Sequence, residues 1–231
     1  GDGFEAIDPM AFTDPKSGRT YLYAGGSAGA TLRAFELNPD LVSLAREVQV
    51  QTPPQFTEGV FMHYYGGRYY LSYSHGGWRE ASYSVHYATA DSPTGPWRYR
   101  GPILVSEGRR KGPGHHSFIR SPLTGEWMIV YHRWENQTGD GPYRGSRQLC
   151  IDRIEYDAEG LIRPIVMTAG SAEPHTGEFT GAMSALGDIR IRDPFILPDR
   201  STGLYYLVAS SGAAITVRRS RDLVLWSGPQ V

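Results

Sequence analysis

A short pattern recurs four times in this sequence of 231 residues. In each copy a polar or ionisable residue opens a strand-like run, a glycine turn follows, and an aromatic-rich run of alternating character comes next. The step from the opening residue to the glycine is 10 residues for Asp8, 9 for Glu58, 10 for His115 and 10 for Asp193. Such regular spacing indicates four copies of one structural unit.

The period of roughly 50 residues predicts an all-β fold of the β-propeller type, because four short strands at that period make one propeller blade. We expect about four blade-like units. Three of them, carrying the Asp8, Glu58 and His115 motifs, fall in residues 1–168, and Leu161–Met167 is expected to be the last strand of the third. Residues 169–187 look like a linker-like connection. Residues 188–231 carry the Asp193 motif.

The charge balance excludes some classes of partner. A formal net charge of -1 gives no electrostatic footprint for nucleic acid or for an anionic membrane. The sequence has no run of 18 apolar residues, so it predicts no membrane span. The first residues lack the pattern of a signal peptide. The single Cys150 excludes an internal disulfide and is expected to be a buried strand residue. The compartment stays open.

If each opening residue heads the innermost strand of a blade, three carboxylates and an imidazole converge on one mouth of a central channel. Carboxylates held close together repel each other, so that one stays protonated while another ionises. Cleavage of a glycosidic bond requires such a pair. Taken one at a time, Asp8 and Asp193 are also typical turn residues before proline, and Glu58 is a typical loop residue. Their shared offset from the glycine favours the functional interpretation.

Several further side chains are candidates for holding a sugar. Aromatic rings in loops stack on sugar rings, although most tyrosines here are more simply core residues. An arginine at the start of a strand is suited to hold hydroxyl groups or to tune a carboxylate, although a surface arginine has the same sequence signal. The candidates for substrate binding are Arg147, Phe61, Trp78, Trp134 and His116.

The motifs together resemble those of glycoside hydrolase family 43, the five-bladed β-propeller arabinofuranosidases, β-xylosidases and arabinanases. The similar segments are Ile7–Pro9, Thr57–Gly59, Gly112–Ser117, Tyr83–Thr89, Asp91–Pro96 and Arg192–Phe195. The resemblance covers nearly the whole chain, and its motifs are specific in combination.

The resemblance implies an inverting hydrolase with a role for each motif. Asp193 is expected to be the general base that activates water, and Glu58 the general acid that protonates the leaving oxygen. Asp8 is expected to orient the acid and tune its pKa. His115 resembles the family histidine that holds a Ca²⁺ or Na⁺ ion in the channel, largely through water; no organic cofactor is expected. Inversion places the acid and base roughly 6.5–9.5 Å apart.

The order of the motifs departs from the family pattern, in which the base motif comes first and five blades are present. Three explanations stay open: a permuted propeller, a fragment in which residues 188–231 begin a second propeller, or a chain from which a segment is missing. Because unpaired blade edges need covering, a homo-oligomer that completes the propeller is expected.

The expected activity is release of α-L-arabinofuranosyl residues from arabinoxylan or arabinan, with plant cell-wall saccharides as partners and β-D-xylosidase as the near alternative. The alternative of a different class is a catalytically inactive propeller fragment that binds carbohydrate or serves in assembly.

Overall fold

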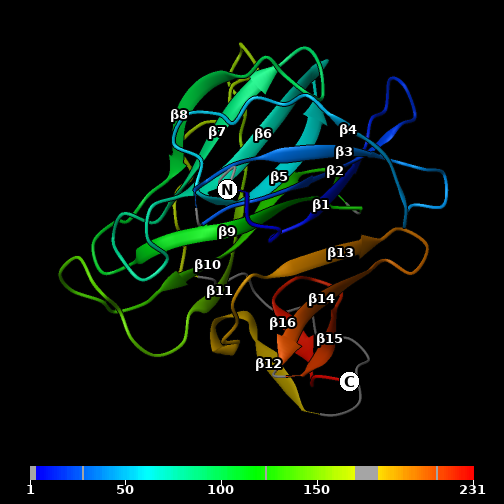
Figure 1. Ribbon diagram of the computed structural model, residues 1–231. Coiled ribbons are helices and arrows are strands. Elements are labelled where there is room, and N and C mark those ends of the chain that lie inside the picture. The colour runs from blue at the N-terminus through cyan, green and yellow to red at the C-terminus, as the bar shows by residue number, and fades with distance from the viewer. Residues whose placement is uncertain (1–3, 28, 123, 170–181, 212) are drawn as a thin grey trace.

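A computed structural model describes residues 4–27, 29–122, 124–169, 182–211 and 213–231. Within these ranges the regular secondary structure is almost entirely β-strand, as predicted (Figure 1). Its one short 3-10 helix is η1 (Leu186–Asp188). The part of the chain that the structure describes includes no helix of the length and apolarity that a membrane crossing requires.

The first two units are four-stranded antiparallel sheets in which each strand pairs with the next along the chain. Alternating aromatic and β-branched residues favour such strands, and glycine turns join them. The strands are β1 (Met10–Thr13), β2 (Thr20–Ala24), β3 (Arg33–Leu37) and β4 (Leu44–Val48), then β5 (Glu58–Tyr65), β6 (Arg68–His75), β7 (Ser84–Ala90) and β8 (Arg98–Leu104).

The third sheet contains three strands, β9 (Lys111–Arg120), β10 (Trp127–Trp134) and β11 (Gln148–Arg153). The prediction of a further strand over Leu161–Met167 is wrong, because this segment forms only an isolated bridge between Ile162 and Tyr156. The segment instead packs against neighbouring strands, with Ile162 and Met167 buried in the core. Cys150 lies buried on β11 as expected, and burial raises the pKa of its thiol to about 12.

The fourth sheet contains β13 (Phe195–Asp199), β14 (Leu204–Ser211) and β15 (Ala214–Ser220). The closing strand β16 (Leu225–Ser227) pairs with β12 (Met183–Ala185), which falls at the end of the predicted connection of residues 169–187. Most of that connection, residues 170–181, lies outside the described residues.

The innermost strands of the four sheets face one another. Strand β9 contacts β5 on one side and β13 on the other, and β5 contacts β1 (Figure 1). Together they line a cavity of about 830 Å³. The sheet carrying Asp193 packs on the third sheet through a buried cluster that includes Leu149, Ile196 and Trp226. The four opening motifs therefore lie at one end of one cavity.

Candidate active site

Each inner strand has a residue with an unusual backbone nearby: Asp8 and Asp193 shortly precede β1 and β13, whereas Gly59 and His115 lie within β5 and β9. Asp8, His115 and Asp193 have φ values of 52°, 46° and 51°, and Gly59 has a φ of 63°. The left-handed region is costly for residues other than glycine, and such conformations cluster at functional sites. By backbone geometry Gly59, and not Glu58, matches the other three, so Glu58 stands one residue earlier than the repeat suggested. This shared turn explains why the four motifs recur.

Three of the predicted site residues form a row. The ring nitrogen Nδ1 of His115 lies 3.4 Å from Oδ1 of Asp193, and Nε2 lies 3.9 Å from Oδ1 of Asp8. The backbone N–H of Gly59 donates to Oδ2 of Asp8 (3.1 Å). His115 itself is anchored by its backbone N–H, which donates to Oγ of Ser74 (2.8 Å). The imidazole thus lies between two carboxylates contributed by the first and fourth sheets.

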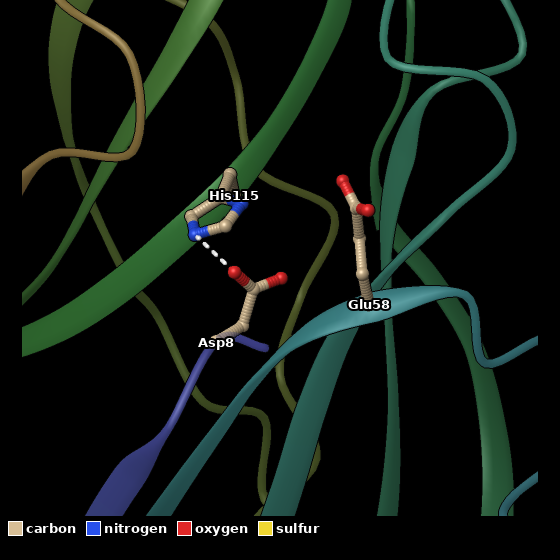
Figure 2. A group of neighbouring side chains, drawn as sticks. All are labelled: Asp8, Glu58 and His115. Carbon is tan, nitrogen blue, oxygen red and sulfur yellow. Dashed lines mark ion pairs between the residues drawn. The ribbon is translucent and has the colours of Figure 1, made fainter. Parts of the chain in front are cut away.

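Glu58 points into the same space from the start of β5 (Figure 2). Two hydroxyl groups hold its carboxylate: Ser27 donates to Oε2 (2.5 Å) and Tyr83 donates to Oε1 (2.6 Å). Tyr83 is fully buried, and its close approach depends on Gly114, where an added Cβ would lie 2.2 Å from the tyrosine ring. The orientation of Glu58 is therefore fixed by the loop after β2 and by the segment before β7.

Cationic groups surround the other end of the row. Asp193 Oδ2 accepts from Nε of Arg192 (3.1 Å), and its Oδ1 lies 3.9 Å from Nη1 of Arg147. The guanidinium of Arg147 lies over the ring of Trp78 at 5.0 Å and contacts Nε2 of the buried His132 at 2.9 Å. An ionised Asp193 thus has its charge compensated by two arginines.

These groups line one small cavity of about 290 Å³. Its lining residues are Ile7, Asp8, Ser27, Glu58, Trp78, His115, Arg147, Arg192 and Asp193. The arrangement brings three carboxylates, an imidazole and two guanidinium groups to one space, with the half-exposed Trp78 at its edge. Such a set of groups can deliver one proton and withdraw another across a bound molecule.

The electrostatics single out Asp8. Burial raises the pKa of Asp8 above its ordinary value, more than the neighbouring His115 lowers it, and the charges of Glu58 and Asp193 raise it further. Crowded carboxylates resist joint ionisation in this way. A proton is therefore held at this row more readily than on an isolated carboxylate in water.

Three predicted binding residues lie away from this small cavity. Trp134 is 2% exposed, and its indole N–H donates to the backbone oxygen of Trp78 (3.0 Å), so it supports the rim and offers no open ring face. Phe61 and His116 line the larger, more apolar cavity between the inner strands. Burial lowers the pKa of His116 to about 3.

Sequence reasoning missed several residues of the site. Ser27 and Arg192 carry no distinctive signal, because a serine in a Gly-rich loop and an arginine before Asp-Pro are common. Tyr83 belongs to the resembling segments but was not singled out as a partner of Glu58. His132 had a usable signal: it is a polar residue in the middle of an apolar strand, β10, where burial requires a partner.

The residues fit a directly bound calcium ion poorly. Asp8, Glu58 and His115 offer ligand atoms within 4.8 Å of one another. This set supplies two carboxylates and one ring nitrogen, whereas Ca²⁺ takes about 6–8 oxygen ligands. Most ligands of a calcium ion here would have to be water.

The similarity to known proteins covers both the sequence and the fold. The family model described as glycosyl hydrolases family 43 matches residues 2–162. A beta-D-galactofuranosidase of Aspergillus niger is 38% identical over 75% of this chain and 50% of its own length. A beta-xylosidase of Xylanibacter ruminicola is 28% identical over 71% of this chain and 59% of its own.

Among solved structures, a family 43 arabinoxylan arabinofuranohydrolase from Bacillus subtilis superimposes with a TM-score of 0.60 and 25% identity. That likeness covers 94% of this chain and 49% of the other, so it extends to the sheet that carries Asp193. The chain spans about half the length of these relatives.

Proposed function

This chain belongs to glycosyl hydrolase family 43, and from its site we propose an inverting glycoside hydrolase that releases α-L-arabinofuranosyl residues from arabinoxylan or arabinan. The observation that carries the proposal is the single small cavity lined by Glu58, Asp193 and Asp8 together with Arg147 and Trp78. Carboxylates contributed by separate sheets face one space, as hydrolysis with an acid and a base requires.

In the proposed mechanism Asp193 takes a proton from water as the water attacks the anomeric carbon. Glu58, held by Ser27 and Tyr83, donates a proton to the leaving oxygen. The two steps occur on opposite faces of the sugar, which inverts the anomeric centre. Asp8 keeps negative charge near the acid, and Arg147 holds sugar hydroxyls.

The size of the cavity supports action on a terminal residue. At about 290 Å³ it lies at the lower limit of ligand pockets, which span about 300–1,000 Å³. One pentose ring suits this space better than the interior of a polysaccharide chain. β-D-Xylosidase activity is the near alternative and is favoured by the similarity to a beta-xylosidase. The plant cell-wall saccharide is the proposed partner.

The proposal is tested by hydrolysis of aryl α-L-arabinofuranoside, β-D-xyloside and β-D-galactofuranoside. Asp193→Ala is expected to lose 10²–10⁴-fold in kcat, the usual contribution of a general base. Glu58→Gln should lose most on substrates with poor leaving groups, because these depend on protonation. The product of the parent chain, followed by NMR, should first appear as the inverted anomer.

A matched control is Glu126→Gln, a carboxylate in an exposed ion pair with Arg153, which should keep parental activity. A folded parent chain without turnover on any of the three substrates would contradict the enzyme proposal. It would favour the inactive fragment that binds carbohydrate or serves in assembly.

Two further expectations remain proposals. The first is that His115 holds a Ca²⁺ or Na⁺ ion through water. If the ion is calcium, a chelator should lower activity or stability; unchanged activity and stability would speak against calcium. A homo-oligomer that completes the propeller is supported by the open side between β13 and β1, where the half-exposed Phe195 borders the large cavity.

A further inference from the structure

His132 lies behind the catalytic row and is shielded from solvent. It is located on β10, opposite Gly114 of β9, and its side chain is 0% exposed. Its ring lies nearly parallel to two neighbouring rings: that of Tyr83 at 6.0 Å with an interplanar angle of 6°, and that of His115 at 6.1 Å and 22°. The imidazole is therefore fixed both in position and in plane.

Both ring nitrogens of His132 face groups of the site. Nη1 of Arg147 lies 2.9 Å from Nε2, and the backbone N–H of Asp193 points at Nδ1 from 3.3 Å. The carboxylate oxygen Oδ1 of Asp193 is 3.9 Å from the same Nδ1. One imidazole thus touches the proposed sugar-binding arginine on one side and the proposed base on the other.

The two donors cannot both be satisfied. A neutral imidazole has one N–H and one lone pair, whereas a guanidinium has donors only. Arg147 at 2.9 Å needs the lone pair at Nε2. The proton then lies on Nδ1, where it replaces the longer contact in which the backbone N–H of Asp193 donates to Nδ1 (3.3 Å), and it faces the Asp193 carboxylate at 3.9 Å. In the reverse tautomer the N–H at Nε2 would face an N–H of Arg147 at 2.9 Å, which is the shorter of the two contacts.

We propose, on the basis of the proposed function, that His132 is a positioning residue whose Nε2 accepts from Arg147 while its Nδ1–H is directed at the Asp193 carboxylate. At 3.9 Å that second contact closes through a small rotation of Asp193 or through one bridging water. A single buried ring then sets both the direction of the base and the place of the glycone-binding guanidinium.

The charge state of the ring agrees with this tautomer. Burial lowers the pKa of His132 well below its ordinary value, and the charges of Arg147, His115 and Arg192 act in the same direction. An imidazolium at this place would set a second cation against Arg147 with no lone pair for it. The ring therefore works as a neutral donor and acceptor.

The tautomer is tested without any assay of activity. In the full chain labelled with ¹⁵N-histidine, His132 is assigned from the resonance that disappears in His132→Gln. A protonated, pyrrole-type Nδ1 and an unprotonated, pyridine-type Nε2 are expected at neutral pH. A protonated Nε2 overturns the inference even if the enzyme is active, whereas absence of turnover alone would contradict only the proposed function.

Two substitutions separate the two contacts. The amide of His132→Gln reaches the place of Nε2, so it still offers Arg147 an acceptor, and kcat should fall about 10²-fold with KM near parental. The amide of His132→Asn reaches the place of Nδ1, so it still donates toward Asp193, and KM should rise about 10-fold with a smaller loss of kcat. Misplacement of reacting groups by about 1 Å is known to cost about 10²-fold.

His63 supplies the matched control. It is a buried histidine on β5 whose Nε2 contacts the hydroxyl of Tyr156 at 2.9 Å, outside the small cavity. His63→Gln should lower the melting temperature but leave the balance of kcat and KM unchanged. If both His132 variants lose stability in the same way and show no opposite shifts in kcat and KM, the residue has only a structural role.

Discussion

Two borders of the same inner ring of strands differ sharply. Between β5 and β9 the sheets meet in a dense aromatic cluster, where Phe118 lies 5.8 Å from Phe61 and 4.8 Å from the ring of His63. Between β13 and β1 the large cavity intervenes, and the side chains of Phe195 and Leu197 are 47% and 52% exposed. The first is a closed seam and the second an open one.

The open seam carries half-exposed apolar residues, although its strands follow the same opening pattern as those of the closed seam. Large exposed apolar side chains next to a cavity indicate a surface that another element covers. The site spans both seams, because Glu58 is the first residue of β5 at the closed seam while Asp193 precedes β13 at the open one. Stability and chemistry are therefore expected to depend on different borders.

The largest expected effect compares two phenylalanines on inner strands. Phe118→Ala should destabilise the chain by about 3–5 kcal/mol, because a buried aromatic ring leaves a cavity. Phe195→Ala should change the unfolding free energy by less than about 1 kcal/mol, because half of its ring already faces solvent. Urea denaturation of both variants measures the difference. Equal losses would show that the open seam is packed in solution.

The sequence predicts individual strands better than the pairing between distant segments. The alternating aromatic-rich runs and the glycine turns are local signals, and runs of this kind form strands such as β6. Pairing between distant segments has no such signal: β16 joins β12 instead of continuing the fourth sheet, and Leu161–Met167 packs without forming a strand.

The residues of the candidate site also differ in how well the sequence predicts them. Asp8, His115 and Asp193 were predictable because each opens a repeat and adopts the same left-handed turn. Ser27 reaches the site through the approach of separate sheets, which no spacing in the sequence records. Trp134 has an aromatic ring that could stack on a sugar, but its position on β10 buries it.

A smaller effect concerns association at the open seam. If a second copy covers this face, the parent chain should dimerise with rising concentration, and Leu197→Asp should weaken that dimer because it buries a charge. Sedimentation velocity over a concentration series measures the shift. Val42→Asp, at an 87% exposed position near β4, is the control. A parent chain that stays monomeric, or an equal effect of both substitutions, speaks against this interface.

The smallest expected effect concerns Asp8, whose charge is proposed to serve the chemistry of the site and not the packing of the fold. Asp8 stands beside the open seam but reaches across to the N–H of Gly59. Its pKa is raised by burial and by Glu58 and Asp193, so its ionised form costs stability at neutral pH. Asp8→Asn keeps an acceptor for Gly59 and removes that charge, so it should raise the melting temperature at pH 7 while lowering activity. A gain of about 1 kcal/mol corresponds to ~2–4 °C for a chain of this size.

The pH dependence gives the sign of this effect. Below the ordinary pKa of 3.8 the carboxyl is neutral in both the folded and the unfolded chain, so parent and Asp8→Asn should have equal stability there. As the pH rises from 3.8 through the raised folded pKa, the unfolded chain ionises first, and the parent loses stability relative to the variant. Between pH 3 and 8 the melting temperatures of the two proteins should differ more as the pH rises, with Asp8→Asn the more stable. Curves that diverge instead as the pH falls would mean that His115 outweighs burial and that the ionised Asp8 stabilises the fold.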